Sequence, residues 1–266
     1  MDDGERAPLT AIVTSCNEAS LLPRALRGIG FCDELIVIEV GDEDGETAAV
    51  AERYGARLVR HPHVRIAEAA RVTVAPQARH DLLLVIDPDE EVPAPLGEEI
   101  ARVARDLPPD VAAVDAPLRF YFAGRPLRGT VWGGPNRRRM LVRRDAVELT
   151  PTIWGGMRLH DGYRVLELPY SEERAIVHHW AGGWRELVEK HRRYLRQEPG
   201  DRAAAGHVTG LRAIAGTPWH SFWESFVRRR GYRDGLIGLG LSVFWAAFRT
   251  AGEVALFRRV RAGSGR

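Results

Sequence analysis

The stretch Leu82-Leu83-Leu84-Val85-Ile86-Asp87-Pro88-Asp89-Glu90-Glu91 is the most informative part of this chain for its fold. Five apolar residues are followed by four carboxylates within five positions. A short apolar run bounded by charge is typical of a strand that is buried on both faces, as in a parallel sheet. Open α/β sheets bind ligands at the carboxyl ends of their strands, so we expect these carboxylates in a binding site.

Two of these carboxylates are suited to hold a metal ion. Asp87 and Asp89 flank Pro88, which interrupts the alternation of side chains along a strand, so both carboxylates can face one ion. A hard divalent cation such as Mg²⁺ or Mn²⁺ takes oxygen ligands and can bridge phosphate oxygens. The stretch therefore predicts chemistry on a diphosphate. A solvated turn is the alternative, because an isolated Asp-x-Asp pattern also occurs by chance.

Before this stretch, strands and helices alternate along the chain. The residue patterns predict strands at 9–15, 34–39, 56–60 and 81–86, and helices opening at 17–20 and covering 46–54, 66–75 and 93–105. This alternation is typical of βαβ units with right-handed crossovers. The expected fold class is α/β, with a mostly parallel nucleotide-binding sheet flanked by helices.

The pattern changes after residue 110. Short apolar segments separated by Gly, Pro and Asp run from 111 to 177 and predict antiparallel strands with long loops. A charged helix is expected at 183–197 and a helical tail at 219–260. We expect three parts: a nucleotide-sugar-binding half (1–110), an acceptor-binding and catalytic part of the same domain (111–200), and a basic helical C-terminal extension (201–266).

Charge is distributed unevenly along the chain. Residues 1–110 contain 11 Arg and 22 Asp or Glu, a net charge of −11, whereas the remainder contains 27 Lys or Arg and 14 Asp or Glu, a net charge of +13. An acidic half suits a cation site, and a basic half suits phosphates or an anionic membrane surface. The two cysteines, Cys16 and Cys32, are expected to be inert core thiols, and the lack of a Cys/His cluster argues against zinc.

The ends of the chain bear on its location. Residues 1–5 are acidic and lack an apolar core, which argues against a signal peptide. The tail from 219 to 266 has 9 Arg and 3 acidic residues, and its 13-residue apolar stretch is too short to span a bilayer. We expect this tail, over 219–260, to make peripheral membrane contact with Phe244, Trp245 and Phe248 inserted. Packing on the domain or on a second subunit is the alternative.

Polar residues also follow the first two predicted strands. Thr14, Asn17 and Glu18 lie where a free helix N-terminus could hold a nucleotide. Glu39 ends the second strand, where a carboxylate could accept hydrogen bonds from a base edge or a ribose hydroxyl. A cap region without a ligand and a solvent-facing Glu are the alternatives.

Taken in order, four segments resemble the family 2 glycosyltransferases, most closely their small non-processive members that extend lipopolysaccharide cores. They are TSCNEASLLPRAL (14–26), ELIVIEVGDEDGET (34–47), Arg71, and Asp87-Pro88-Asp89-Glu90. The resemblance covers about residues 8–195. It implies a GT-A fold in which Thr14, Asn17 and Glu18 line the nucleotide pocket, Glu39 faces the base or ribose, Arg71 contacts donor phosphate or orders the site, Asp87 lies near ribose and metal, and Asp89 coordinates the metal.

A second set of residues extends the resemblance. Arg137-Arg138-Arg139 is followed about 20 residues later by His160-Asp161, where the family has His-Glu. The resemblance implies that Asp161 is the base that deprotonates the acceptor hydroxyl and that His160 ligates the metal or orients the site. Arg138 and Arg139 are candidates for binding the leaving diphosphate, with Arg139 expected to point inward. A surface loop and a solvated charge run are the alternatives.

Three positions depart from the family pattern. Glu39 stands for the usual Asp, Val72 for the usual Asn, and Asp42-Glu43-Asp44 adds negative charge near an anionic donor. These departures bear on the donor nucleotide more than on the fold. Further along, His178 and His179 are expected to pack or to cap, with a second metal ligand as the alternative. Trp132, Trp154 and Trp184 are expected mainly to pack, with stacking on sugar rings as the alternative.

The expected function is metal-dependent, inverting transfer of a sugar from a nucleotide diphosphate donor, with uridine diphosphate as the expected nucleotide. The acceptor would be a hydroxyl of a saccharide, a lipid-linked saccharide or a cell-envelope glycan. A nucleotidyltransferase and a catalytically degenerate, membrane-associated nucleotide-sugar-binding protein are the alternatives. No nucleic-acid partner is expected, and the protein could form a homo-oligomer. The expected location is cytoplasmic, with peripheral contact at the inner face of the cell membrane.

Overall fold

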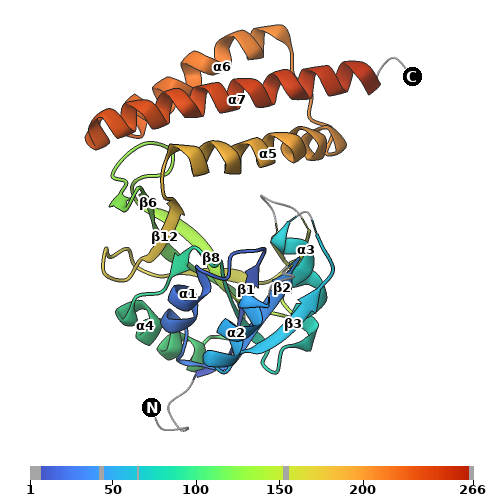
Figure 1. Ribbon diagram of the computed structural model, residues 1–266, viewed down its shortest axis with the longest axis vertical. Coiled ribbons are helices and arrows are strands. Elements are labelled where there is room, and N and C mark those ends of the chain that lie inside the picture. Colours follow the sequence, from blue (N-terminus) through green and yellow to red (C-terminus); the bar gives the residue numbers. More distant parts are fainter. Residues whose placement is uncertain (1–6, 42–44, 65, 152–155, 264–266) are drawn as a thin grey trace. The chain divides into compact units, whose positions relative to one another are not determined.

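The computed structural model describes residues 7–41, 45–64, 66–151 and 156–263. Residue contacts divide the chain into two compact units: unit 1 comprises 1–118 and 137–178, and unit 2 comprises 119–136 and 179–266 (Figure 1). Unit 2 thus includes a segment from the middle of the chain. The functional division at 110 and 200 stays a prediction.

Unit 1 is built on a parallel sheet. Strands β3 (Arg57–His61), β2 (Cys32–Val40), β1 (Ala7–Ser15) and β4 (Leu82–Ile86) lie side by side in that order. The sheet continues beyond β4 with the antiparallel strand β8. Beyond β8, the sheet continues in the order β6, β12 and β5. Two further strands pair with β6: β11 in parallel and β7 antiparallel. Their bounds are β5 (Glu90–Glu91), β6 (Val111–Phe122), β7 (Arg125–Pro126), β8 (Asn136–Arg143), β11 (Arg164–Glu167) and β12 (Ile176–Ala181).

Helices cover both faces of this sheet (Figure 1). Helix α3 (Ala67–Val74), which continues into the short helix η1 (Ala75–Gln77), packs on one face together with the two-stranded sheet of β9 (Val147–Leu149) and β10 (Met157–Leu159). Helices α1 (Leu22–Gly28) and α4 (Ala94–Arg105) lie on the other face, and α2 (Glu46–Arg53) precedes β3. Proline in the first turn of α1 and of α4 is compatible with helix initiation, because no intrahelical N–H is needed there.

The elements predicted in the first half of the chain are confirmed. Each predicted strand or helix is present, and its ends differ from the prediction by only a few residues; the strand expected at 81–86 runs from Leu82 to Ile86 with every residue buried. The α/β fold with a helical C-terminal extension is likewise confirmed. Residues 1–5, Asp42-Glu43-Asp44 and Trp154 lie outside the described residues.

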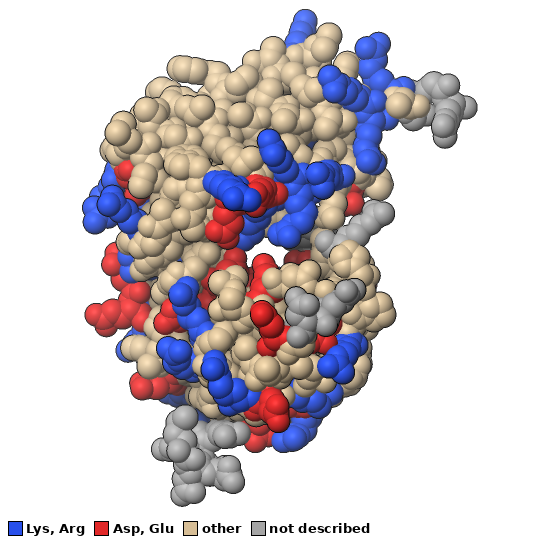
Figure 2. All heavy atoms as spheres, in the orientation of Figure 1, with Lys and Arg blue, Asp and Glu red and all other residues tan. Residues whose placement is uncertain are grey.

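Unit 2 is mainly helical. Helices α5 (Trp184–Ala204), α6 (Leu211–Trp223) and α7 (Gly235–Gly263) pack together, and the short helices η2 (Glu224–Arg228) and η3 (Gly231–Asp234) join α6 to α7. On the face seen in Figure 2, the surface of α6 and α7 includes a broad area without charged side chains. Among the described residues, one helical stretch, Gly231–Ala262, is long and apolar enough to cross a membrane by length and composition. This differs from the expectation that the apolar stretch is too short to span, because a single charge, Arg249, ends that stretch while the helix and its mostly apolar composition continue beyond it.

The core of unit 2 contains a histidine enclosed by aromatic rings. His191 is 4% exposed, and its ring packs edge-on against Trp132, Trp180, Phe244 and Phe248. Burial lowers the pKa of His191 to about 4, although a hydrogen bond from Nδ1 to the Leu187 carbonyl oxygen acts in the opposite direction. The imidazole is therefore neutral at pH 7.

This low pKa predicts an acid-sensitive helical unit. The unfolded chain binds a proton on His191 below about pH 6.5, whereas the folded unit does so only near pH 4. The free energy of unfolding should therefore fall by roughly 3 kcal/mol as pH drops through this window, and no further below it. Urea unfolding followed by tryptophan fluorescence at several pH values measures this loss. His191→Phe should remove this part of the pH dependence, and an equal dependence in that variant would contradict the assignment.

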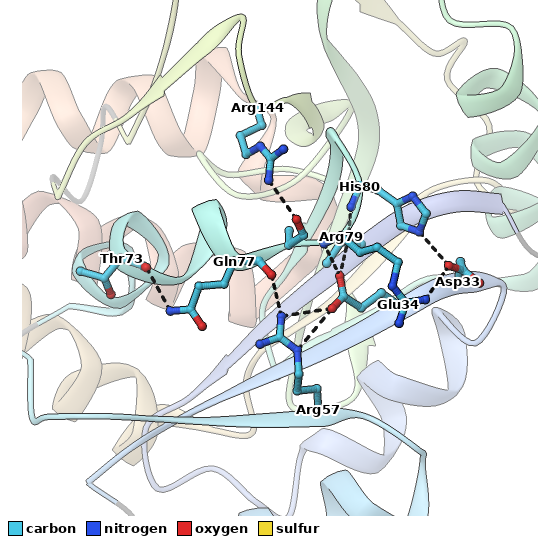
Figure 3. A network of polar contacts seen from close by, with 10 residues as sticks. Asp33, Glu34, Arg57, Thr73, Gln77, Arg79, His80 and Arg144 are labelled. Carbon is cyan, nitrogen blue, oxygen red and sulfur yellow. Dashed lines mark hydrogen bonds and ion pairs between the residues drawn. The ribbon is translucent and has the colours of Figure 1, made fainter.

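The amino-terminal edge of the sheet is held by an ion-pair network around the buried carboxylate of Glu34 (Figure 3). Glu34 accepts hydrogen bonds from the Thr10 hydroxyl at 2.8 Å, the Arg79 N–H at 2.7 Å and the Arg57 guanidinium at 3.1 Å. Burial raises the pKa of Glu34, but these donors outweigh it and hold the pKa below its ordinary value. This network ties β1, β2 and β3 together and leaves Glu34 fully engaged, so we assign it a structural role.

Candidate active site

Strand register brings three strand ends to one edge of the sheet. In the parallel pairing of β1 with β2, Ser15 lies opposite Glu39, and in the pairing of β1 with β4, Val13 lies opposite Ile86. Asp87 therefore follows its strand beside Thr14. Because these strands are parallel and in register, the predicted site residues at their carboxyl ends share one edge. This is the edge at which α/β sheets bind ligands.

A continuous set of charge-assisted hydrogen bonds runs along this edge. Arg71, on α3, donates to the Thr14 hydroxyl at 3.2 Å and makes a short ion pair with Asp87. Arg138, on β8, reaches the other oxygen of Asp87 at 2.6 Å and Glu90 Oε1 at 2.7 Å. The Asp87 N–H donates to Glu90 Oε2 at 2.9 Å. The carboxylates of Asp87 and Glu90 are therefore held in position by guanidinium groups.

The arginines separate the protonation behaviour of these two acids, because burial raises the pKa of both while Asp87 has two guanidinium partners and Glu90 has one. Burial raises the pKa of Asp87, but Arg138 and Arg71 together hold it well below its usual range, so Asp87 is ionised. Glu90 is fully buried, and burial raises its pKa to about 7 despite the favourable charge of Arg138. Buried charges of this kind are tolerated because each is paired and hydrogen-bonded.

Asp89 meets a histidine that is distant in sequence. Strand β5 pairs with β12 so that Glu90 lies opposite His178, and His178 Nε2 lies 3.1 Å from Asp89 Oδ2. The same imidazole has its Nδ1 4.0 Å from Glu90 Oε1. The sequence pattern favoured a packing role for His178. The register of β5 with β12, which a single sequence does not reveal, instead places it beside the metal-ligand candidate.

Glu39 and the first loop lie at the same edge. Glu39 is 4% exposed; its Oε2 pairs with Arg60 at 2.8 Å, while its Oε1 is buried without a hydrogen-bond partner among the described residues. Asn17 is exposed and has a left-handed backbone (φ 60°), which Asn tolerates better than most residues. The Glu18 N–H lies 3.4 Å from the Ser15 hydroxyl, so the loop after β1 turns sharply at the strand end.

The two candidate arginines are placed in the reverse of the expected order. Arg138 points to Asp87 and Glu90, whereas Arg139 makes a two-point ion pair with Asp115 on β6, at 2.9 and 3.3 Å. Alternation along β8 sends the two side chains to opposite faces of the sheet, as expected, but the sequence does not reveal which of the two shares a face with Asp87. Arg139 is therefore a structural ion-pair partner.

The backbone contacts of His160 lie at the opposite edge of the sheet from Asp87, and the catalytic roles of His160 and Asp161 stay predictions. The His160 N–H donates to the Ala146 carbonyl, three residues beyond the end of β8. Because β8 is antiparallel to β4 and Arg143 lies opposite Leu82, this position is at the amino-terminal edge of β4. The length of β4, about 13 Å, separates it from Asp87. Both side chains are exposed, and no hydrogen bond joins them to the described residues around Asp87.

Asp89 and His178 form the donor set that best fits a divalent cation. A carboxylate oxygen and an imidazole nitrogen that already converge suit Mn²⁺, which accepts both ligand types. Asp87 fits less well, because both of its oxygens are engaged by guanidinium groups. No group of three or more His, Cys, Asp or Glu that could hold a metal occurs among the described residues. A cation here would therefore depend on ligands from a bound substrate.

Comparison with known proteins adds to this geometry. Residues 10–160 match the profile of glycosyl transferase family 2. A TPR repeat-containing protein of Synechococcus elongatus is 40% identical over 77 residues, a match that covers 29% of this chain and only 19% of that protein.

Solved structures show a similar fold. The mannosyltransferase PcManGT from Pyrobaculum calidifontis, in complex with GDP-Man and Mn²⁺, matches with a TM-score of 0.56 and 18% identity over 96% of this chain and 88% of that chain. Glucosyl-3-phosphoglycerate synthase from Mycobacterium tuberculosis, in complex with phosphoglyceric acid, matches with a TM-score of 0.50 and 17% identity over 77% of this chain and 82% of that chain. These likenesses confirm the GT-A fold. Because the family profile covers more than half of its length, the chain belongs to glycosyl transferase family 2.

Proposed function

We propose that this protein transfers a sugar from a nucleotide diphosphate donor to a hydroxyl acceptor and that the reaction depends on a divalent cation. The observation that carries the proposal is the pairing of Asp89 with His178 at the strand edge where Asp87 is held by Arg71 and Arg138. A strand edge with a purely structural role would not require five charged or titratable side chains in one place. Family membership supports the reaction class, and PcManGT was solved with a nucleotide sugar and Mn²⁺.

Each residue of the edge then has a distinct role. Asp89 and His178 would hold the cation, which when bound neutralises the charge that develops on a leaving diphosphate. Asp87, fixed and ionised, would orient the ribose side of the donor. Arg71 and Arg138 hold Asp87 in place and keep positive charge near the phosphates. The acceptor oxygen would bond to the anomeric carbon on the face opposite the diphosphate, the bond from that carbon to the diphosphate oxygen would break, and the acceptor proton would be released; this inverts the anomeric centre, in keeping with the family resemblance.

Glu39 is the proposed contact to the nucleobase or the ribose. Its Oε1 is a buried acceptor without a partner among the described residues, an arrangement that costs free energy unless a donor satisfies it. An imide N–H of a base or a ribose hydroxyl would supply that donor. Uridine diphosphate remains the proposed nucleotide, and a saccharide or lipid-linked saccharide the proposed acceptor.

Ligand-dependent stability tests this proposal. A panel of UDP-sugars and GDP-mannose, each with and without Mn²⁺, should include a donor that raises the free energy of unfolding by about 2.7 kcal/mol at one hundred times its Kd. The gain should depend on Mn²⁺ and should shrink in Glu39→Ala. Thermal unfolding measures it, and release of nucleoside diphosphate with an acceptor separates an enzyme from a binding protein.

Two outcomes would contradict the proposal. Stabilisation by nucleoside triphosphates but by no nucleotide sugar would favour a nucleotidyltransferase. A donor that binds with Mn²⁺ but is never consumed across an acceptor panel of saccharides and lipid-linked saccharides would favour the non-catalytic binding protein.

A further inference from the structure

The connection between α6 and α7 exposes a cluster of large apolar side chains. We call this cluster the hairpin tip; it consists of Trp219, Trp223, Val227, Tyr232, Leu236, Leu239 and Val243. Trp219 is 69% exposed and Leu236 86% exposed. Soluble surfaces rarely gather large apolar residues in this way without a partner.

Helical spacing brings these residues to one end of the helix pair. Trp219, Trp223 and Val227 are four residues apart along α6 and η2, so they share one face. Tyr232 lies in η3, and Leu236, Leu239 and Val243 lie in the first nine residues of α7. The Trp219 and Trp223 rings lie 5.9 Å apart, and Phe222 and Phe226 stack at 5.3 Å, so the aromatic side chains of the tip support one another.

Arginines surround the hairpin tip. Arg228, Arg229, Arg230 and Arg233 lie in or beside the turn, and all four are exposed. The nearby acid Asp234 is directed inward, where it accepts hydrogen bonds at 2.8 Å from the backbone N–H groups of Arg128 and Gly129. The second acid of the connection, Glu224, is half-buried, so four exposed arginines outweigh it and the turn has a net positive charge, which complements an anionic surface.

The packing of α7 argues for a helix that lies on a membrane rather than one that crosses it. In its second half, Glu253 pairs with Arg202 of α5 at 2.9 Å, and α5 is rich in charged residues throughout. A spanning α7 would have to bring this polar helix into the hydrocarbon or lose the contact. The aromatic residues expected to insert are not available either: Phe248 is buried, and Phe244 and Trp245 pack on the core of unit 2.

We propose that the hairpin tip docks on the surface of an anionic lipid bilayer, with its apolar side chains in the interface and its arginines at the headgroups. Tryptophan and tyrosine favour this region because one part of the ring is apolar and the other polar. Basic residues near the surface add attraction to anionic lipids. The docking surface is independent of donor binding, so it stands or falls separately from the proposed reaction.

Vesicle sedimentation with the full-length protein tests the proposal. Wild-type protein should bind vesicles of phosphatidylglycerol and bind vesicles of phosphatidylcholine more weakly. Trp219→Ser combined with Leu236→Ser should lower the partition coefficient at least tenfold on both. Arg228→Gln combined with Arg229→Gln should lower it roughly tenfold or more on phosphatidylglycerol alone and reduce its salt dependence. Because all four side chains are exposed, these variants are expected to fold.

Matched controls come from the other end of the same helices. Val208→Ser removes an equally exposed apolar side chain before α6, and Arg258→Gln combined with Arg259→Gln removes two arginines near the end of α7. Neither should change binding appreciably. Absence of wild-type binding to phosphatidylglycerol, or equal losses in the controls, would overturn the proposal. So would a dimer in sedimentation that Trp219→Ser and Leu236→Ser convert to a monomer without any effect on vesicles.

Discussion

Asp89→Asn is expected to lower the rate of sugar transfer by roughly 10²- to 10³-fold at saturating donor, as is typical when one preorganised electrostatic group is lost. The amide keeps the shape of the side chain beside His178 but loses the negative charge that a divalent cation requires. Release of nucleoside diphosphate, measured over a range of Mn²⁺ concentrations, provides the rate. His178→Gln should also raise the Mn²⁺ concentration needed for half-maximal rate.

A matched substitution exists at the other end of the same strand. Asp81 precedes β4 and forms an exposed ion pair with Arg144 at 2.5 Å, a type of pair that contributes little to stability. Asp81→Asn should therefore leave both rate and metal requirement unchanged. If Asp89→Asn transferred sugar as fast as the wild type, the metal assignment would have to be abandoned.

Arg138→Met is expected to destabilise unit 1 by about 3–5 kcal/mol, the usual cost of removing one partner from a buried ion pair. Arg138 joins Asp87 and Glu90 at 2.6 and 2.7 Å, and Glu90 has no access to solvent. Without the guanidinium, the carboxylates of Asp87 and Glu90 keep the Arg71 ion pair and the nearby His178 imidazole among the described residues. Urea unfolding at pH 7 measures the loss, and a fraction of the chain is expected to be insoluble on expression.

A second substitution keeps this prediction testable if the single variant does not fold. Glu90→Gln in the Arg138→Met background replaces a buried carboxylate by a neutral amide that still accepts the Asp87 N–H, so part of the stability should return. Arg144→Met is the matched control and should cost at most about 1 kcal/mol, because its partner Asp81 is exposed. No recovery in the double variant would show that charge is not the cause of the loss.

The fold could be predicted from the sequence because its signals are local. The run Leu82–Ile86 is apolar on both faces, and helices with proline in the first turn alternate with strands at regular spacing. In a βαβ arrangement, these local signals also determine which strand ends meet. Thr14, Glu39 and Asp87 accordingly lie at the same edge, where the resemblance to the family expected them.

Antiparallel pairing decides positions that local patterns do not. Arg138 and Arg139 are adjacent in sequence, and only the pairing of β8 with β4 shows which one faces Asp87. The motif His160-Asp161 matched a family pattern in sequence, yet the course of the chain through β9 and β10 returns it to the opposite edge. A short motif carries no information about the direction in which its strand runs.

The sequence by itself therefore determined the class of fold, the acidic strand end and the family, because hydrophobic periodicity and ordered motifs depend on neighbours along the chain. Only the tertiary structure decided that His178 meets Asp89 across 89 positions, that Arg138 forms an ion pair with Asp87, and that Trp219 and Leu236 are exposed. These outcomes depend on strand register and on which helix face is buried. Both are determined by packing between distant segments, which the residues of any one segment do not encode.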